Sequence, residues 1–220
     1  MTIGMILLII VAVLILLGVG QRVLDRLRLN DKLALLFIAL IIGLGFVPDI
    51  RVTDVFAFNL GGAVVPLALC VYLFIRADTA WERWRSILAS LVTGAAVFAI
   101  GVFAPDEPET ITVDPIILYG LAAGLIAYLF GRSRRCAFIA GVVGMMLSDT
   151  ANAFYVWSQG VPQDFVLGGA GAADGIVIAG LLAVLLAELL GEIIERMKRG
   201  THRPTREFRN GEFIKEDEAR

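Results

Sequence analysis

Two aspartates, Asp149 and Asp174, lie in apolar segments on either side of one short polar turn. A carboxylate in hydrocarbon is costly and is seldom retained for packing alone. Two carboxyl groups that meet in a low-dielectric site share a proton, so that one can act as a general base on water and the other as a general acid. The same pair could instead bind a proton or cation for transport, or hold two helices together as a neutral hydrogen-bonded pair.

The residues around the two aspartates extend this candidate site. Asn152 lies one helical turn beyond Asp149 on the same face, where its amide can hydrogen-bond the carboxyl group. Small residues surround Asp174 and allow another backbone or an extended peptide to come close, although the same composition is typical of close helix packing. The glycines that we assign to substrate binding here are Gly168, Gly169, Gly171 and Gly175.

A second glycine run brings a third segment to the site. Leu60-Gly61-Gly62-Ala63 repeats Leu167-Gly168-Gly169-Ala170, and it leads to Pro66, which lacks a backbone donor and therefore frees a carbonyl. We assign Gly61, Gly62 and Pro66 to substrate binding as well. The repeat indicates a parallel duplication of three plus one plus three helices.

The composition indicates which elements must position these residues. Of the 220 residues, 58% are hydrophobic and only 18% are charged, and the mean hydropathy is +0.82, as is typical of a multi-pass membrane protein. The net charge of −2 and the lack of a basic stripe interleaved with aromatic residues argue against nucleic acid as a partner. The expected partner is the lipid bilayer.

Seven apolar runs are long enough to cross about 30 Å of hydrocarbon as helices. The sequence therefore predicts an all-α, seven-helix polytopic fold. The predicted spans are Ile3 to Val19, Leu33 to Val47, Leu60 to Ile75, Ile87 to Phe103, Ile116 to Phe130, Ala137 to Trp157 and Leu167 to Leu190. At ~1.5 Å per residue, Asp149 and Asp174 then lie at nearly the same membrane depth.

The basic residues predict the orientation of these spans. All Lys and Arg residues except Arg51 fall in alternate connections or in the C-terminal segment. By the positive-inside rule the N-terminus is outside and the C-terminus is cytoplasmic. We expect a transmembrane domain over residues 1–194 and a charged cytoplasmic tail over residues 195–220.

The sequence lacks the residues that several kinds of active site need. The only histidine, His202, lies in the tail, which argues against a Ser/His dyad, a histidine-ligated zinc or a histidine-ligated haem in the membrane. No lysine falls within a predicted span, so a retinal Schiff base is not expected. We expect no cofactor and no metal.

The region around Asp174 resembles a known class of protease. Gly171-Ala172-Ala173-Asp174 and the helix that follows look like the GxGD motif of signal peptide peptidases and presenilins, with Ala173 in place of the second glycine. The partner aspartate of that class lies on the preceding helix, as Asp149 does here. The Pro-Ala-Leu segment of the class has a counterpart in Pro66-Leu67-Ala68-Leu69. The resemblance implies an aspartic endopeptidase that hydrolyses membrane-embedded peptides, with Asp149 and Asp174 as its catalytic residues.

Over its whole length the chain resembles an uncharacterised prokaryotic family of small integral membrane proteins. The resemblance rests on Gly-Gly-Ala followed by proline in the third span and on Gly-Gly-Ala-Gly followed by Asp-Gly in the seventh. It implies a multi-pass protein of the prokaryotic plasma (inner) membrane and no particular activity. We therefore expect an intramembrane aspartyl protease, with a proton- or cation-coupled small-solute transporter as the alternative and a membrane scaffold or assembly factor as the third reading.

Overall fold

The structure is a computed structural model that describes residues 3–17, 24, 27, 29–103, 115–131, 133–199, 206–209 and 212–215. Most of the described chain is helical, which confirms the all-α class. The chain divides into two compact units, Met1–Ala187 and Glu188–Arg220. The described residues contain seven α-helices: α1 (Ile3–Leu16), α3 (Asp31–Leu44), α4 (Val65–Ile75), α5 (Ala80–Phe103), α6 (Pro115–Gly131), α7 (Arg134–Ser158) and α8 (Gly175–Arg199).

Each predicted span overlaps one of these helices, but several boundaries differ. α5 and α7 begin several residues before the predicted spans because polar side chains cap them. The hydroxyl of Ser133 accepts a hydrogen bond from the backbone N–H of Cys136 at 3.1 Å, and Thr79 does the same for Glu82 at 3.1 Å. Such caps fix the start of a helix independently of hydrophobicity.

Two helices of the described chain, α5 and α7, are long and apolar enough to cross a membrane. Their most apolar windows have mean hydropathies of 2.2 and 1.3. The other apolar stretches within the described residues are shorter: Gly4–Leu16, Leu60–Ile75, Tyr119–Phe130 and Gly175–Gly191. Crossing by all seven helices, and the direction of crossing, remain predictions.

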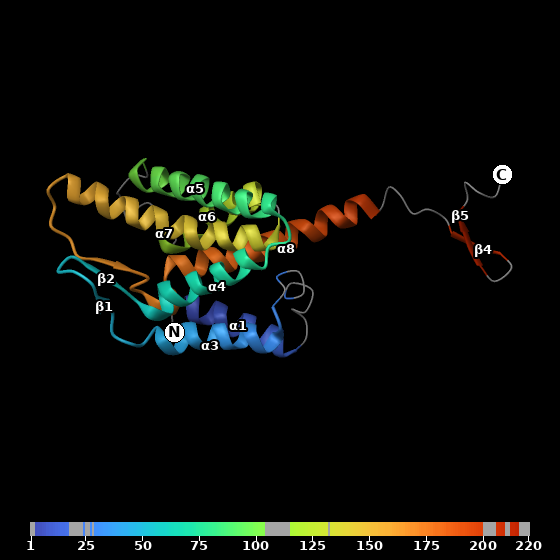
Figure 1. Ribbon diagram of the computed structural model, residues 1–220, viewed down its shortest axis with the longest axis horizontal. Helices are drawn as coiled ribbons and strands as arrows, with labels where there is room; N and C mark the ends of the chain where they lie inside the picture. Colours follow the sequence, from blue (N-terminus) through green and yellow to red (C-terminus); the bar gives the residue numbers. More distant parts are fainter. Residues whose placement is uncertain are drawn as a thin grey trace. The chain divides into compact units, whose positions relative to one another are not determined.

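The helices of the first unit pack in layers. Figure 1 shows α1 and α3 on one side of α4, and α5 and α7 on the other side. Small residues bring α7 close to its neighbours. A β-carbon on Gly144 of α7 would lie 2.7 Å from the β-carbon of Thr93 in α5, and one on Gly141 would lie 2.9 Å from the carbonyl oxygen of Ala179 in α8.

A small sheet, which the sequence analysis did not predict, lies beside the start of α4 and α8 (Figure 1). Its strands are β1 (Ile50–Arg51), β2 (Phe56–Phe58) and β3 (Phe165–Leu167), in the order β1-β2-β3. β1 and β2 are antiparallel. β2 and β3 are parallel, with Phe56 opposite Phe165 and Phe58 opposite Leu167. Because α4 and α8 each follow one strand of this parallel pair, both helices begin at the same end of the unit.

The predicted start of the last helix at Leu167 is wrong. Leu167 ends strand β3, and α8 begins at Gly175. The residues between them form a turn and a short 3₁₀ turn, η2 (Gly171–Ala173). Gly168 and Gly171 adopt positive φ angles of 72° and 57°, which a continuous right-handed helix does not allow.

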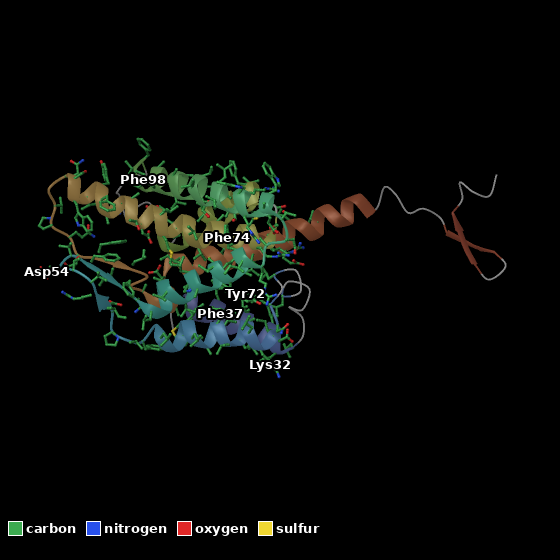
Figure 2. The ribbon with its side chains drawn as sticks, viewed as in Figure 1. Lys32, Phe37, Asp54, Tyr72, Phe74 and Phe98 are labelled. Carbon is green, nitrogen blue, oxygen red and sulfur yellow. The ribbon has the colours of Figure 1, made fainter. Side chains whose placement is uncertain are left out.

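Polar side chains tie the loop between α4 and α5 to the start of α7. The guanidinium group of Arg135 lies 2.8 Å from a carboxylate oxygen of Asp78 and donates a hydrogen bond to the carbonyl of Arg76 at 2.9 Å. The hydroxyl of Ser133 donates to the carboxylate of Glu82 at 2.9 Å. Basic residues therefore gather at the end of the unit opposite the sheet; Figure 2 shows Lys32 at this end and Asp54 at the sheet end.

The second unit contains the end of α8 and one hairpin. Strands β4 (Arg206–Arg209) and β5 (Glu212–Lys215) are antiparallel, with Arg206 opposite Lys215 and Arg209 opposite Glu212. The division at residue 194 stays a prediction.

Candidate functional site

Asp174 occupies the N-cap position of α8, directly after η2. One carboxylate oxygen, Oδ1, accepts a hydrogen bond from the backbone N–H of Ile176 at 3.0 Å. The other, Oδ2, accepts one from the N–H of Ala170 at 3.2 Å. The sequence analysis placed Asp174 inside a helix, whereas the structure places it in the break before one. Two backbone donors and the helix start hold this carboxylate in a defined orientation.

Asp149 lies in α7 and is half-buried. Within the part of the chain that the structure describes, its carboxyl group has no hydrogen-bond partner. It lies close enough to Asp174 for the two negative charges to interact. The two predicted aspartates are therefore within electrostatic reach of each other, with the Asp174 carboxylate held by the backbone and the Asp149 carboxyl group without such support among the described residues.

Backbone contacts between glycines assemble the rest of the site. We call Gly4, Gly45, Gly61, Gly62, Gly168 and Gly171 the glycine junction. Gly61 and Gly62 belong to a π-helical turn, η1 (Leu60–Val64), that precedes α4. A β-carbon on Gly62 would meet the carbonyl of Gly168, and one on Gly61 would meet the backbone of Gly45. A β-carbon on Gly4 would lie 2.7 Å from the α-carbon of Ala173, next to Asp174.

Asn59 is a positioning residue that the sequence analysis missed. It is only 2% exposed, and its side-chain oxygen accepts hydrogen bonds from the N–H groups of Gly61 and Gly62, both at 3.0 Å. Its amide nitrogen donates to Asp49 at 2.8 Å, and its backbone N–H donates to the carbonyl of Leu167 at 2.9 Å. An asparagine directly before the apolar run that starts at Leu60 is a recognisable N-cap signal, and it could have been found in the sequence.

The remaining predicted site residues differ in their surroundings. Asn152 is exposed and, among the described residues, forms no hydrogen bond with Asp149. Gly169 is also exposed. Gly175 is buried as the first residue of α8. Pro66 is buried in the first turn of α4, where a helix needs no backbone donor, and not in a helix interior as predicted.

Fold and site together define an α-helical protein with a pair of aspartates beside two helices, each of which starts from a strand and a non-α-helical turn. The chain belongs to the family described as "Protein of unknown function (DUF1614)", whose profile matches residues 19–186. No curated protein and no solved structure matches this chain.

Proposed function

We propose that this protein is an intramembrane aspartyl protease, located as a multi-pass protein in the plasma (inner) membrane of a prokaryote. The observation that carries the proposal is the position of Asp149 in α7, within electrostatic reach of Asp174 at the break that precedes α8. Two carboxyl groups that share a proton are the machinery of aspartic proteases. The resemblance to the GxGD motif supports the same assignment.

The reaction uses water and the two carboxyl groups. One carboxylate takes a proton from a water molecule, and the resulting hydroxide attacks the carbonyl carbon of the peptide bond. The other carboxyl group donates its proton to the carbonyl oxygen. The carboxyl group that took the proton from water then gives it to the amine nitrogen, and the C–N bond breaks. The other carboxylate takes a hydroxyl proton back from the collapsing gem-diol, which leaves the new carboxyl product. Because backbone N–H groups hold Asp174, its orientation is set before the substrate binds.

The membrane location has two supports besides composition. α5 and α7 have the length and apolarity of membrane spans. The polar contacts of Arg135 and Ser133 lie at one end of the unit, and the sheet with Asp49, Arg51 and Asp54 lies at the other. This separation is the pattern of a protein whose middle section lies in hydrocarbon. Unwound backbone at membrane depth is tolerated where other protein segments cover it, as the glycine junction does here.

The test is cleavage of a single-span peptide by the purified full chain in liposomes. The wild type should release two fragments, and Asp149→Asn and Asp174→Asn should each reduce the rate to background. Asp164→Asn is the matched control because Asp164 is an exposed aspartate in the loop before β3. Cleavage that persists in either site variant, or a wild type that cleaves no peptide of a varied panel, would overturn the proposal.

One observation favours a transporter as the second candidate. β2 and β3, which precede the last helix of each half of the predicted duplication, pair in parallel and place two interrupted helix starts side by side. Interrupted segments at corresponding positions of two repeats are typical of binding sites in secondary transporters. This candidate predicts solute uptake into liposomes that depends on an imposed proton or sodium gradient and is lost in Asp149→Asn, with no peptide cleavage in any variant.

A further inference from the structure

An apolar cavity of about 160 Å³ separates the α1–α3 pair from α4, α7 and α8. Among the described residues, its lining has no charged and no polar side chain, and these five helices and Leu24, Leu27 and Leu29 contribute to it. The residues that define its walls are Leu8, Phe37, Ile38, Phe138, Val177 and Leu181.

The lining of the cavity extends along the helices and begins one helical turn from Asp174. On α8 it extends from Val177, one turn after Asp174, to Leu185, which is ~12 Å along the helix axis. On α3 it extends from Ile41, one turn before Gly45, back to Ala34, a distance of ~10 Å. Its long axis therefore follows the helices away from the glycine junction.

The cavity opens to the side of the molecule. Leu8 is 1% exposed, whereas Leu14, further along α1 and also part of the lining, is 37% exposed. The exposed apolar side chains of α1 around this position would face lipid in a membrane. A hydrocarbon chain that enters beside Leu14 would pass the apolar side chains of α1.

Loose packing of the α1–α3 pair does not account for the cavity. At the glycine junction the α1–α3 pair is in backbone contact with η2, the turn that leads into α8: Gly4 lies against Ala172 and Ala173, and Gly45 lies against Gly171. Apolar cavities of this size stay dry and accept apolar ligands, because water finds no hydrogen-bond partner in them. Close packing at one end and a dry, elongated space beyond it are the features of a ligand site.

We propose that this cavity binds one acyl chain of a membrane lipid. The elongated shape, the wholly apolar lining and the lateral opening fit a flexible hydrocarbon chain. The proposal rests on the membrane location argued above and is independent of the Asp149/Asp174 chemistry.

The test uses a phospholipid with a photoactivatable diazirine near the end of one acyl chain. The full chain in lipid nanodiscs is irradiated, digested and analysed by mass spectrometry. In the wild type, adducts on Val177, which is 3% exposed and lines the cavity, should exceed those on Val97 at least tenfold. Val97 is 2% exposed and lies outside the cavity. Equal yields at the two valines would overturn the proposal.

A variant that fills the cavity provides a second test of the proposal. Ala34→Phe places a ring in the cavity and should lower the adducts on Val177 at least fivefold. Ala95→Phe is the matched control, since Ala95 is exposed on α5. Unchanged labelling in a folded Ala34→Phe protein would contradict the proposal. Asp149→Asn should label as the wild type does. A wild type that is labelled at Val177 but cleaves no peptide refutes the protease alone.

Discussion

The two aspartates are held in different ways, and this difference is the main finding at the scale of single residues. Asp174 accepts two backbone hydrogen bonds at a helix start, whereas Asp149 has no hydrogen-bond partner among the described residues. A carboxylate that serves only as a cap has no need of a second carboxylate nearby, because the interaction of like charges is unfavourable. The charge interaction with Asp149 therefore favours a chemical role for the pair.

Substitutions of Asp174 separate capping from chemistry. Asparagine caps helices about as well as aspartate, whereas alanine loses ~1 kcal/mol. We expect Asp174→Ala to lower the free energy of unfolding by about that amount and Asp174→Asn to leave it unchanged, as measured by denaturant titration. Both variants should lose cleavage. If the Asp174→Asn protein kept full activity, Asp174 would serve only as a helix cap and not as a catalytic residue.

The close backbone contacts predict a large effect of one methyl group. Gly62→Ala forces a β-carbon against the carbonyl of Gly168 and to 3.0 Å from the α-carbon of Gly171. Overpacking of this kind costs about 1–3 kcal/mol. Gly43→Ala, in α3 with no atom within 4 Å, should instead stabilise by about 0.5–1 kcal/mol. Thermal unfolding of the two variants in parallel checks the contrast, and equal melting temperatures would contradict it.

Residue types predicted the aspartate pair, but tertiary contacts decided what surrounds it. A carboxylate in an apolar run stands out in any sequence because burial of charge is costly. The role of Asn59 depends on Asp49 and Leu167, and nothing local in the sequence indicates those contacts. Asn152 fits the spacing rule for a helix face, yet in the structure it is exposed.

At the scale of elements, the repeated Leu-Gly-Gly-Ala motif adopts two different conformations. The first copy forms the π-helical turn η1, and the second begins with Leu167 in β3 and continues with Gly168 at positive φ. The register of β2 and β3 pairs Leu167 with Phe58 and not with Leu60. Sequence identity predicted two helix starts of one kind, but backbone pairing across the sheet overrides the local pattern.

Asn59 should control the conformation of η1. Asn59→Ala removes the acceptor for two N–H groups and leaves them buried without a partner, which costs about 1–3 kcal/mol. Asn152→Ala, at an exposed position, should change the free energy of unfolding by less than about 0.5 kcal/mol. Equal stability of the two alanine variants would show that Asn59 does not hold the turn.

In the first of the molecule's two units, the sheet lies at one end and the basic side chains of Lys32 and Arg135 lie at the other. Composition predicted that the protein is helical and apolar, because helix content and hydropathy are averages over many residues. The sequence does not predict the sheet because each of its strands has at most three residues. Such strands are too short to show an alternation of apolar and polar residues. Leu167, the last residue of β3, is also the first residue of the seventh predicted span.

Cysteine labelling tests the orientation of the two ends. Thr53→Cys lies at the sheet end and Ala80→Cys at the basic end, and both positions are exposed. In intact cells a membrane-impermeant maleimide should label the first and should label the second only after lysis. The native Cys70 and Cys136 are buried and give a low background. The reverse pattern, or equal labelling, would refute the predicted topology.

The most direct test of the account is the proximity of positions 149 and 174 in native membranes. A chain with Asp149→Cys and Asp174→Cys, and with Cys70 and Cys136 replaced by alanine, is treated with a short bifunctional thiol reagent and analysed by mass spectrometry. We expect an intramolecular cross-link in this chain and none in a control that carries Asp149→Cys and Asp164→Cys. Two reactive thiols at 149 and 174 that never cross-link would contradict a shared aspartate site.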